Sequence, residues 1–166
     1  IDGTLPCTLP NPENLDEPFE ITKGVSQATA PLRTMTWLSI NCAYAKLSQI
    51  VGLDRVVATM YRMAASEWLS KETYTIQPYA SLATGANELS AMDMASGIQT
   101  LANSGVHREP YMIQRIDDSK GTILFENEAS VAEQTLPIDV ANNAADIMRG
   151  VIEFGTARRT PLEGGR

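Results

Sequence analysis

The sequence predicts a mixed α/β (α+β) chain that is dominated by helices and contains one short β-hairpin. Apolar residues recur at spacings of three and four along several stretches, which is typical of helices with one buried face. Two apolar runs, at 111–116 and 122–125, flank a polar turn and predict the hairpin. With 166 residues, of which 43% are hydrophobic, the chain is large and apolar enough to form one core.

The first 30 residues form a proline-rich lead-in, which we expect to be extended or looped because proline fixes φ and lacks an amide donor. A helical pattern runs over 31–51, and Gly52 suits its C-terminal cap. Asp54 opens a second, shorter helix. The residues expected on the buried side of this shorter helix are Val56, Val57, Met60 and Met63.

The periodicity is lost over 66–87, which predicts a long irregular connection. Residues 90–93 read as a capping box, so a helix is predicted from there to the Ser104–Gly105 pair. A last helix is predicted from Pro137 to Phe154, and Gly155 ends it. The residues expected to be buried along this last helix are Val140, Ala144, Ile147, Met148 and Val151.

Charge and composition exclude several classes of function. The net charge is −7, from 20 acidic and 13 basic residues, and such a chain repels a phosphate backbone, so no nucleic-acid partner is expected. No apolar run reaches the roughly 18 residues that a membrane-spanning helix needs. The chain begins at Ile1 rather than at a methionine and ends in loop-like sequence, so we expect it to be part of a longer protein.

Few residues suggest a cofactor or a metal. His107 is the one histidine, and its position after Gly105 predicts a surface turn residue rather than a metal ligand. No glycine-rich phosphate loop is present, so no cofactor is predicted. Asp117 and Asp118 fall in the predicted hairpin turn, where aspartate is favoured because its side chain bonds the local backbone.

Cys7 and Cys42 are the two cysteines of the chain. A disulfide between them would close a loop of about 35 residues, which the chain-entropy model values at about 3.5–4 kcal/mol. Two free, buried thiols are the alternative. An oxidising compartment would favour the bridge, and the sequence leaves both possibilities open.

The tripeptide Ser39–Ile40–Asn41 interrupts the helical run over 31–51 with two side chains that compete for backbone hydrogen bonds. One interpretation is a helix junction, in which Ser39 or Asn41 caps the helix that follows. The other is that a hydroxyl and a carboxamide project together into a cleft. A hydroxyl can relay a proton, while a carboxamide can donate to and accept from a peptide bond of a substrate.

Further segments follow this tripeptide in a fixed order: Val51–Leu53, Leu82–Ser90, Met94–Ser96, Leu101–Val106 and Gly150–Ala157. Together with 31–47 they resemble the transpeptidase domain of penicillin-binding proteins, most closely the bifunctional class A enzymes. The resemblance runs from about Leu32 to Arg166. It implies that residues 1–166 are a partial transpeptidase domain with the serine β-lactamase-like α/β fold, in which this piece supplies most of the helical lobe.

The resemblance also implies roles for two residues. Ser39 matches the serine of the family's Ser-x-Asn motif, which passes a proton between the nucleophile and the leaving group. Asn41 matches its asparagine, which orients the donor peptide or the side-chain amide of a β-lactam. These two are the candidate catalytic residues of this chain.

Two family motifs are absent from the 166 residues. No lysine has a serine three positions before it, because Glu20, Ala43, Trp68 and Asp117 occupy those positions. No lysine is followed by Thr-Gly either. In the family these motifs flank the matched region, so we expect truncation at both ends and no activity from this piece alone. We also expect it to expose apolar surface where the missing strands pack, and to self-associate.

The resemblance implies that the parent protein is a serine-type D,D-transpeptidase, which cross-links peptidoglycan stem peptides and is trapped by β-lactams. It would be membrane-anchored and act on the extracytoplasmic side of a bacterial membrane, in the periplasm or cell-wall space. Two alternatives remain: a non-catalytic relative that uses the helical lobe for binding, and a helical interaction module with an accidental Ser-Ile-Asn.

Overall fold

The computed structural model describes residues 1–64, 75–128 and 132–158. Within these ranges the chain forms five α-helices and three two-stranded antiparallel sheets. The mixed α/β, mainly helical class predicted from the sequence is confirmed. The helices are α1 (Leu32–Trp37), α2 (Asn41–Val51), α3 (Leu53–Met63), α4 (Ala91–Ala102) and α5 (Ile138–Phe154).

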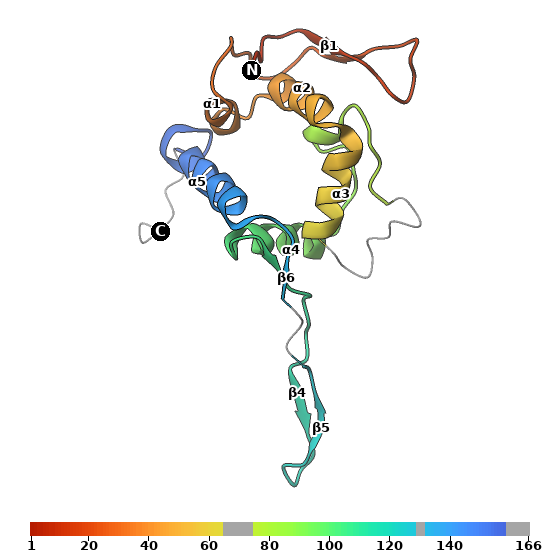
Figure 1. The fold of residues 1–166 in the computed structure, drawn as a ribbon, viewed down its shortest axis with the longest axis vertical. Coiled ribbons are helices and arrows are strands. Elements are labelled where there is room, and N and C mark those ends of the chain that lie inside the picture. The colour runs from red at the N-terminus through yellow and green to blue at the C-terminus, as the bar shows by residue number, and fades with distance from the viewer. Residues whose placement is uncertain (65–74, 129–131, 159–166) are drawn as a thin grey trace.

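The five helices are arranged as a ring, as Figure 1 shows. Along the ring α2 contacts α3, α3 contacts α4 and α4 contacts α5, and α5 contacts α1 to close it. The short 3₁₀ helix η1 (Leu82–Thr84) packs on α2. The ring therefore brings the first and last helices of the chain side by side.

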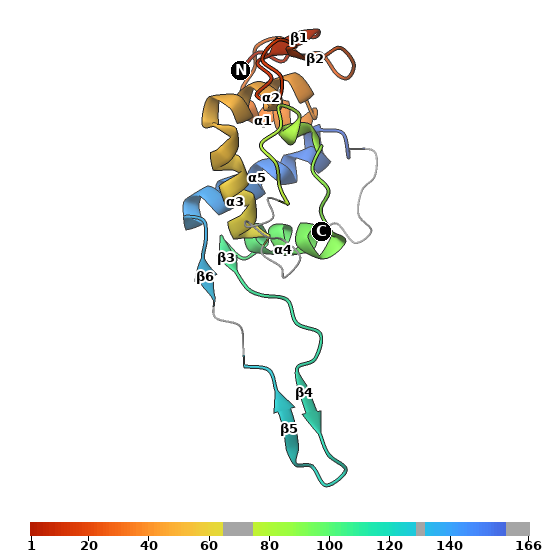
Figure 2. The same ribbon diagram turned by 90° about the vertical axis from the view of Figure 1, so that its right-hand side faces the viewer.

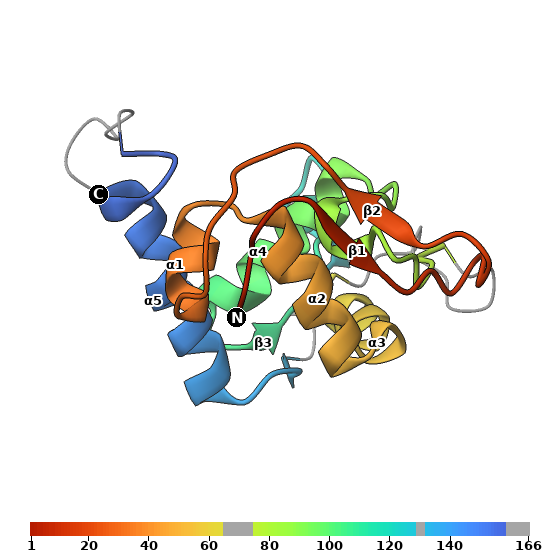
Figure 3. The same cartoon turned by 90° about the horizontal axis from the view of Figure 1, so that it is seen from above.

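The lead-in is not helical. It forms β1 (Cys7–Leu9) and β2 (Phe19–Ile21), which pair in antiparallel register, and it lies over α2 (Figure 3). An antiparallel bridge between Gly3 and Gln27 joins the two ends of the lead-in, as do hydrogen bonds between Ile1 and Ala30. Residues 1–27 are therefore tied into a loop on one side of the helical ring.

The predicted hairpin is present, although its first strand is shorter than the apolar run and its second is shifted by one residue. β4 (Arg115–Asp117) pairs with β5 (Ile123–Glu126), and the hairpin projects away from the helices (Figure 2). At its base β3 (Val106–His107) pairs with β6 (Glu133–Gln134). The strand residues of β4 and β5 are all exposed, and among the described elements no helix packs closely on them.

The turn of this hairpin is explained by Asp118. One oxygen of its carboxylate accepts hydrogen bonds of 2.8 Å from the backbone amides of Lys120 and Thr122. These two hydrogen bonds lower the pKa of Asp118, and the bond from Thr122 has the larger effect. Asp117, at the end of β4, pairs with Arg115 at 2.8 Å. Both aspartates are thus structural residues of the hairpin.

The predicted start of α4 is confirmed. The Ser90 hydroxyl accepts from the Asp93 amide at 3.1 Å, and the Asp93 carboxylate accepts from the Ser90 amide at 3.1 Å. The buried positions of α4 are polar, however, whereas Met94 and Ile98 of its apolar pattern are about half exposed. Periodicity predicts the helix correctly, but it does not say which face another part of the chain covers.

The last helix shows a similar difference. Pro137 stands at the N-cap of α5 and Gly155 at its C-cap, as predicted. Val140 and Met148 were expected to be buried and are exposed, whereas Ala141 and Gly150 are buried. Small residues are buried there because α5 lies close against its neighbours.

In α3 the expected residues Val56, Val57, Met60 and Met63 are only partly buried, and Tyr61 is the buried residue. Its hydroxyl accepts a hydrogen bond of 2.8 Å from the Ile76 amide. The irregular connection expected over 66–87 contains η1, and its part over 66–74 lies outside the described residues. None of the described helices has the length and apolar character that a membrane crossing requires.

Candidate functional site

The Ser39–Asn41 tripeptide forms the turn between α1 and α2. The Ser39 amide donates to the Thr36 carbonyl at 3.1 Å, and the Ile40 amide donates to the Met35 carbonyl at 3.0 Å. These two bonds and a left-handed residue after the helix are the signature of a Schellman motif. Ser39 is that residue, with φ of 56°, at a position where glycine is the usual choice.

The Schellman motif explains why α1 ends where it does. Ile40 and Met35 are both fully buried and belong to one apolar cluster, which is the hydrophobic contact that accompanies this motif. Ile40 then serves as the N-cap of α2, and Asn41 is the first residue of that helix. Ser39 and Asn41 therefore flank a buried residue, and both are exposed.

The capping interpretation of the tripeptide is wrong. No side chain caps the start of α2, and within the described part of the chain neither Ser39 nor Asn41 has a side-chain hydrogen-bond partner. A free hydroxyl and a free carboxamide are thus presented at the start of α2, where the helix dipole adds positive potential. This pair can relay a proton and hold an amide group, which is the chemistry expected of the motif.

Trp37 attaches this turn to the last helix. Its indole lies against Phe154, with ring centroids 4.9 Å apart, and the Thr156 amide donates to the Trp37 carbonyl at 3.0 Å. A methyl group added at Gly150 would overlap the indole ring. Two segments of the family resemblance, 31–47 and 150–157, therefore meet at this contact.

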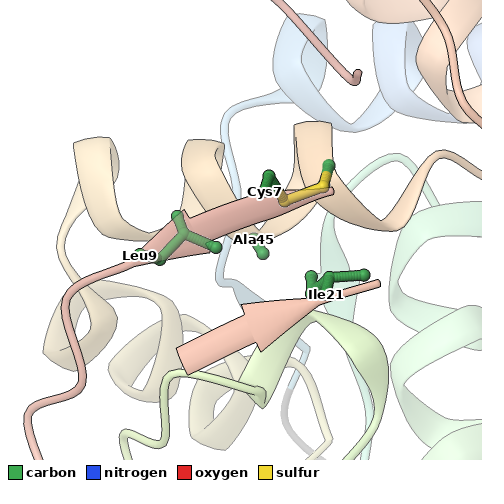
Figure 4. Packing of buried hydrophobic residues seen from close by; sticks show 5 residues of the cluster. Cys7, Leu9, Ile21 and Ala45 are labelled. Carbon is green, nitrogen blue, oxygen red and sulfur yellow. A yellow bond between two sulfur atoms is a disulfide. The ribbon is translucent and has the colours of Figure 1, made fainter. Parts of the chain in front are cut away.

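The two cysteines form a disulfide, with Cα atoms 6.2 Å apart. Figure 4 shows the bridge within an apolar cluster that includes Leu9, Ile21 and Ala45. Cys7 is 6% exposed and Cys42 is fully buried. The bridge joins β1 to the first turn of α2, directly after Asn41.

The expectation that His107 is a surface turn residue is wrong. It lies in β3, is 5% exposed, and its Nδ1 is 3.0 Å from the hydroxyl of the buried Thr100. That hydroxyl is also 2.8 Å from the Met63 carbonyl, so the contact ties α3, α4 and β3 together. No group of three or more His, Cys, Asp or Glu suited to a metal occurs among the described residues.

Several residues that support the Ser39–Asn41 turn cannot be predicted from the sequence. Asp2 pairs with Lys46 at 2.6 Å, and Gly3 lies against Ile40 so closely that an added methyl group would overlap it. These partners are far apart in the chain, so no local pattern could reveal them.

A cavity of about 430 Å³ lies elsewhere, between α4 and residues 108–111, and Ser39 and Asn41 do not line it.

Residues 13–164 match the family model described as the penicillin binding protein transpeptidase domain. Among curated proteins, penicillin-binding protein 1A of Aquifex aeolicus is 30% identical over 151 residues, which are 91% of this chain and 19% of that protein. Penicillin-binding protein 1A of Mycobacterium tuberculosis is 27% identical over 87% of this chain and 19% of its own length. The chain thus spans about a fifth of these relatives.

Solved structures show the same fold. The penicillin-binding protein PonA1 from Mycobacterium tuberculosis aligns with a TM-score of 0.83 and 23% identity, over 100% of this chain and 44% of that one. Its complex with penicillin V aligns with a TM-score of 0.79 and 26% identity, with the same coverage. Because the family model covers nearly the whole sequence, the chain belongs to the penicillin-binding protein transpeptidase domain family.

Proposed function

We propose that the protein containing this chain is a peptidoglycan D,D-transpeptidase. A serine hydroxyl attacks the D-Ala-D-Ala bond, and its proton passes to the departing D-alanine amine. The acyl group is then transferred from the serine to an amine of a neighbouring stem peptide, which releases the serine with its proton restored. The match of residues 13–164 to the transpeptidase family is the observation that carries this proposal.

In this reaction Ser39 relays the proton and Asn41 orients the substrate amide. Two observations support these roles. Both side chains are exposed and free of partners among the described residues, and Ser39 occupies a left-handed position where a serine is disfavoured. Residues held in such conformations cluster at functional sites, because the surroundings must enforce them.

The nucleophile comes from outside these residues, since the sequence contains neither Ser-x-x-Lys nor Lys-Thr-Gly. This chain alone should therefore form no covalent adduct with penicillin. The proposed partners of the parent are stem peptides and β-lactams, and no nucleic acid. We place it on the extracytoplasmic side of the membrane, to which it would be anchored. The Cys7–Cys42 disulfide suits such an oxidising compartment.

The test is acylation of the parent protein by a fluorescent penicillin, followed over time. Asn41→Ala should slow acylation about ten- to a hundredfold, because misplacement of the substrate amide costs rate at that scale. Asn143→Ala makes the same change at an exposed position of α5 and is the matched control, with the wild-type rate expected. Equal rates in the two variants would refute the role of Asn41, and a parent that takes up no penicillin would refute the function.

A further inference from the structure

Residues 1–27, here called the N-terminal strap, are joined to α2 along its length by contacts that include four specific ones. The Asp2–Lys46 ion pair, the close approach of Gly3 to Ile40 and the Cys7–Cys42 disulfide are three of them. In the fourth, the Gln49 carboxamide donates to the Pro10 carbonyl at 2.8 Å. The contacts run along α2 from its cap to its last turn, so the strap and the helix form one unit.

Two of these contacts lie partly or fully at the surface, and two lie beside the site. The Asp2–Lys46 ion pair is partly exposed and the Gln49 bond to the Pro10 backbone carbonyl is exposed, and contacts of this kind contribute little rigidity. The disulfide is covalent and buried, and Cys42 directly follows Asn41 in the chain. The disulfide is therefore the strongest constraint on the position of Asn41 relative to the strap.

A second part of the strap, at Gly24, lies near the Asn41 side chain. The Asn41 carboxamide nitrogen is 3.6 Å from the point where a Cβ on Gly24 would stand. Gly24 follows β2, which pairs with β1 and whose Ile21 packs in the apolar cluster that contains the disulfide. If the strap moved away from α2, Asn41 would lose the constraint that the disulfide places on Cys42. Gly24 would also no longer lie next to the Asn41 side chain.

The left-handed conformation of Ser39 makes the turn sensitive to that support. A non-glycine residue keeps such a conformation only while its surroundings enforce it. Here the enforcing contact is the burial of Ile40 against Met35 and under Gly3 of the strap. Loosening the strap should therefore let the Ser39–Asn41 turn relax.

We infer that the Cys7–Cys42 disulfide is a positioning element for Asn41, so that the acylation activity of the parent depends on the oxidation state of this pair. The inference rests on the proposed transpeptidase function. A dithiol reductant breaks the sulfur–sulfur bond by supplying two electrons and two protons; two cysteine thiols form, and the reductant becomes its own disulfide. A disulfide oxidant reverses the step. Both cysteines are buried, so we assign them a positioning role and not a catalytic one.

The experiment measures acylation of the parent by a fluorescent penicillin at saturating concentration, in three forms: oxidised wild type, wild type reduced with dithiothreitol, and the double variant Cys7→Ser/Cys42→Ser. About a tenfold loss of rate is expected in the last two forms, a scale typical of a misplaced catalytic group. Re-oxidation of the reduced wild type should restore the rate. The control is Leu9→Ala, which weakens the same apolar cluster but keeps the bridge, and it should stay within about twofold of wild type.

A double-mutant cycle separates positioning from stability. In an Asn41→Ala background, loss of the disulfide should cause almost no further loss of rate, because the group that it positions is gone. If the two losses multiply instead, the disulfide acts elsewhere and the inference is wrong. Amide hydrogen exchange on the same samples should rise over 38–43 on reduction and stay constant over α4, which also shows that the protein remains folded.

Failure of the proposed transpeptidase function and failure of the disulfide inference would give different results. An oxidised parent that takes up no penicillin contradicts the proposed function, while the exchange measurement still decides whether the disulfide orders the turn. An oxidised parent that is acylated at the same rate after complete reduction contradicts the inference alone.

Discussion

The indole Nε1 of Trp37 donates a hydrogen bond of 2.9 Å to the carbonyl of Ile147, across 110 residues of sequence. This bond lies next to the turn that carries Ser39 and joins the end of α1 to the middle of α5. The ring of helices closes at this point. The position of the candidate site therefore depends on a contact between the first and last helices.

Gly150→Ala tests this closure, because a methyl group at Gly150 would overlap the indole. Overpacking should outweigh the better helix propensity of alanine and lower the free energy of unfolding by about 1–2 kcal/mol. Gly97→Ala in α4 is the matched control, since its methyl group would stand 3.5 Å from Ala64 and fit. It should raise stability by up to about 1 kcal/mol. Urea titrations of the two variants compare them, and a stabilising Gly150→Ala would contradict the packing described.

Ser39→Gly should separate stability from activity. Glycine relieves the left-handed strain, so we expect the free energy of unfolding to rise by up to about 1 kcal/mol, while acylation of the parent falls because the hydroxyl is lost. Ser104 has φ of 53° at the end of α4, so Ser104→Gly makes the same change away from the site. Its acylation rate should stay at the wild-type value. Denaturant melts give the first quantity and penicillin acylation the second.

Part of the strain relief in Ser104→Gly is offset, because its hydroxyl donates to Asn142 at 3.0 Å and that bond is lost. The comparison therefore relies on the acylation rates, where the two variants should differ. An active Ser39→Gly enzyme would contradict the proton-relay role of Ser39.

Acid should break the ion pair between Asp2 of the strap and Lys46 of α2. The hydrogen bond from Lys46 lowers the pKa of Asp2 from 3.8 to about 2 in the folded chain. Because the folded pKa lies below the unfolded one, the contribution of this pair to stability is present above about pH 4 and is lost as the pH falls towards about 2. NMR titration of the Asp2 carboxyl carbon checks the value. Asp2→Asn should remove this part of the pH dependence of unfolding, and an ordinary carboxyl pKa would contradict the ion pair.

Self-association remains a prediction, now with defined surfaces. The exposed apolar residues include Met94 and Ile98 on α4 and Met148 and Ile152 on α5. Apolar surface of this kind favours association. Sedimentation velocity should show dimers or larger species of the isolated chain that decrease in Met94→Ser/Ile98→Ser. A monomer over the whole concentration range would contradict the prediction.

The sequence predicts best what is encoded locally. The capping box at Ser90, the proline that opens α5 and the glycines that end α2 and α5 each act through adjacent backbone groups, and the structure has each of them where the sequence predicts it. The tripeptide Ser39–Asn41 was also found as an interruption, because two polar side chains break a helical pattern.

Other features depend on contacts between distant segments. Met94 and Ile98 follow a helical pattern, yet whether they are buried depends on what packs against them. His107 follows a glycine turn, yet it is buried, because its ring bonds the Thr100 hydroxyl, which also bonds the Met63 carbonyl. The left-handed serine at position 39 contradicts the usual glycine preference, so only the three-dimensional arrangement reveals it.

The projecting β4–β5 hairpin has a practical consequence. Its tip, at residues 119–121, lies at the far end from the helical ring, and Gly121 has open space around it (Figure 2). Exposed loop tips tolerate inserted residues. We expect that a fluorophore or an affinity tag placed there would leave the helical ring and the Ser39–Asn41 turn unchanged, and would report on the location of the parent protein in living cells.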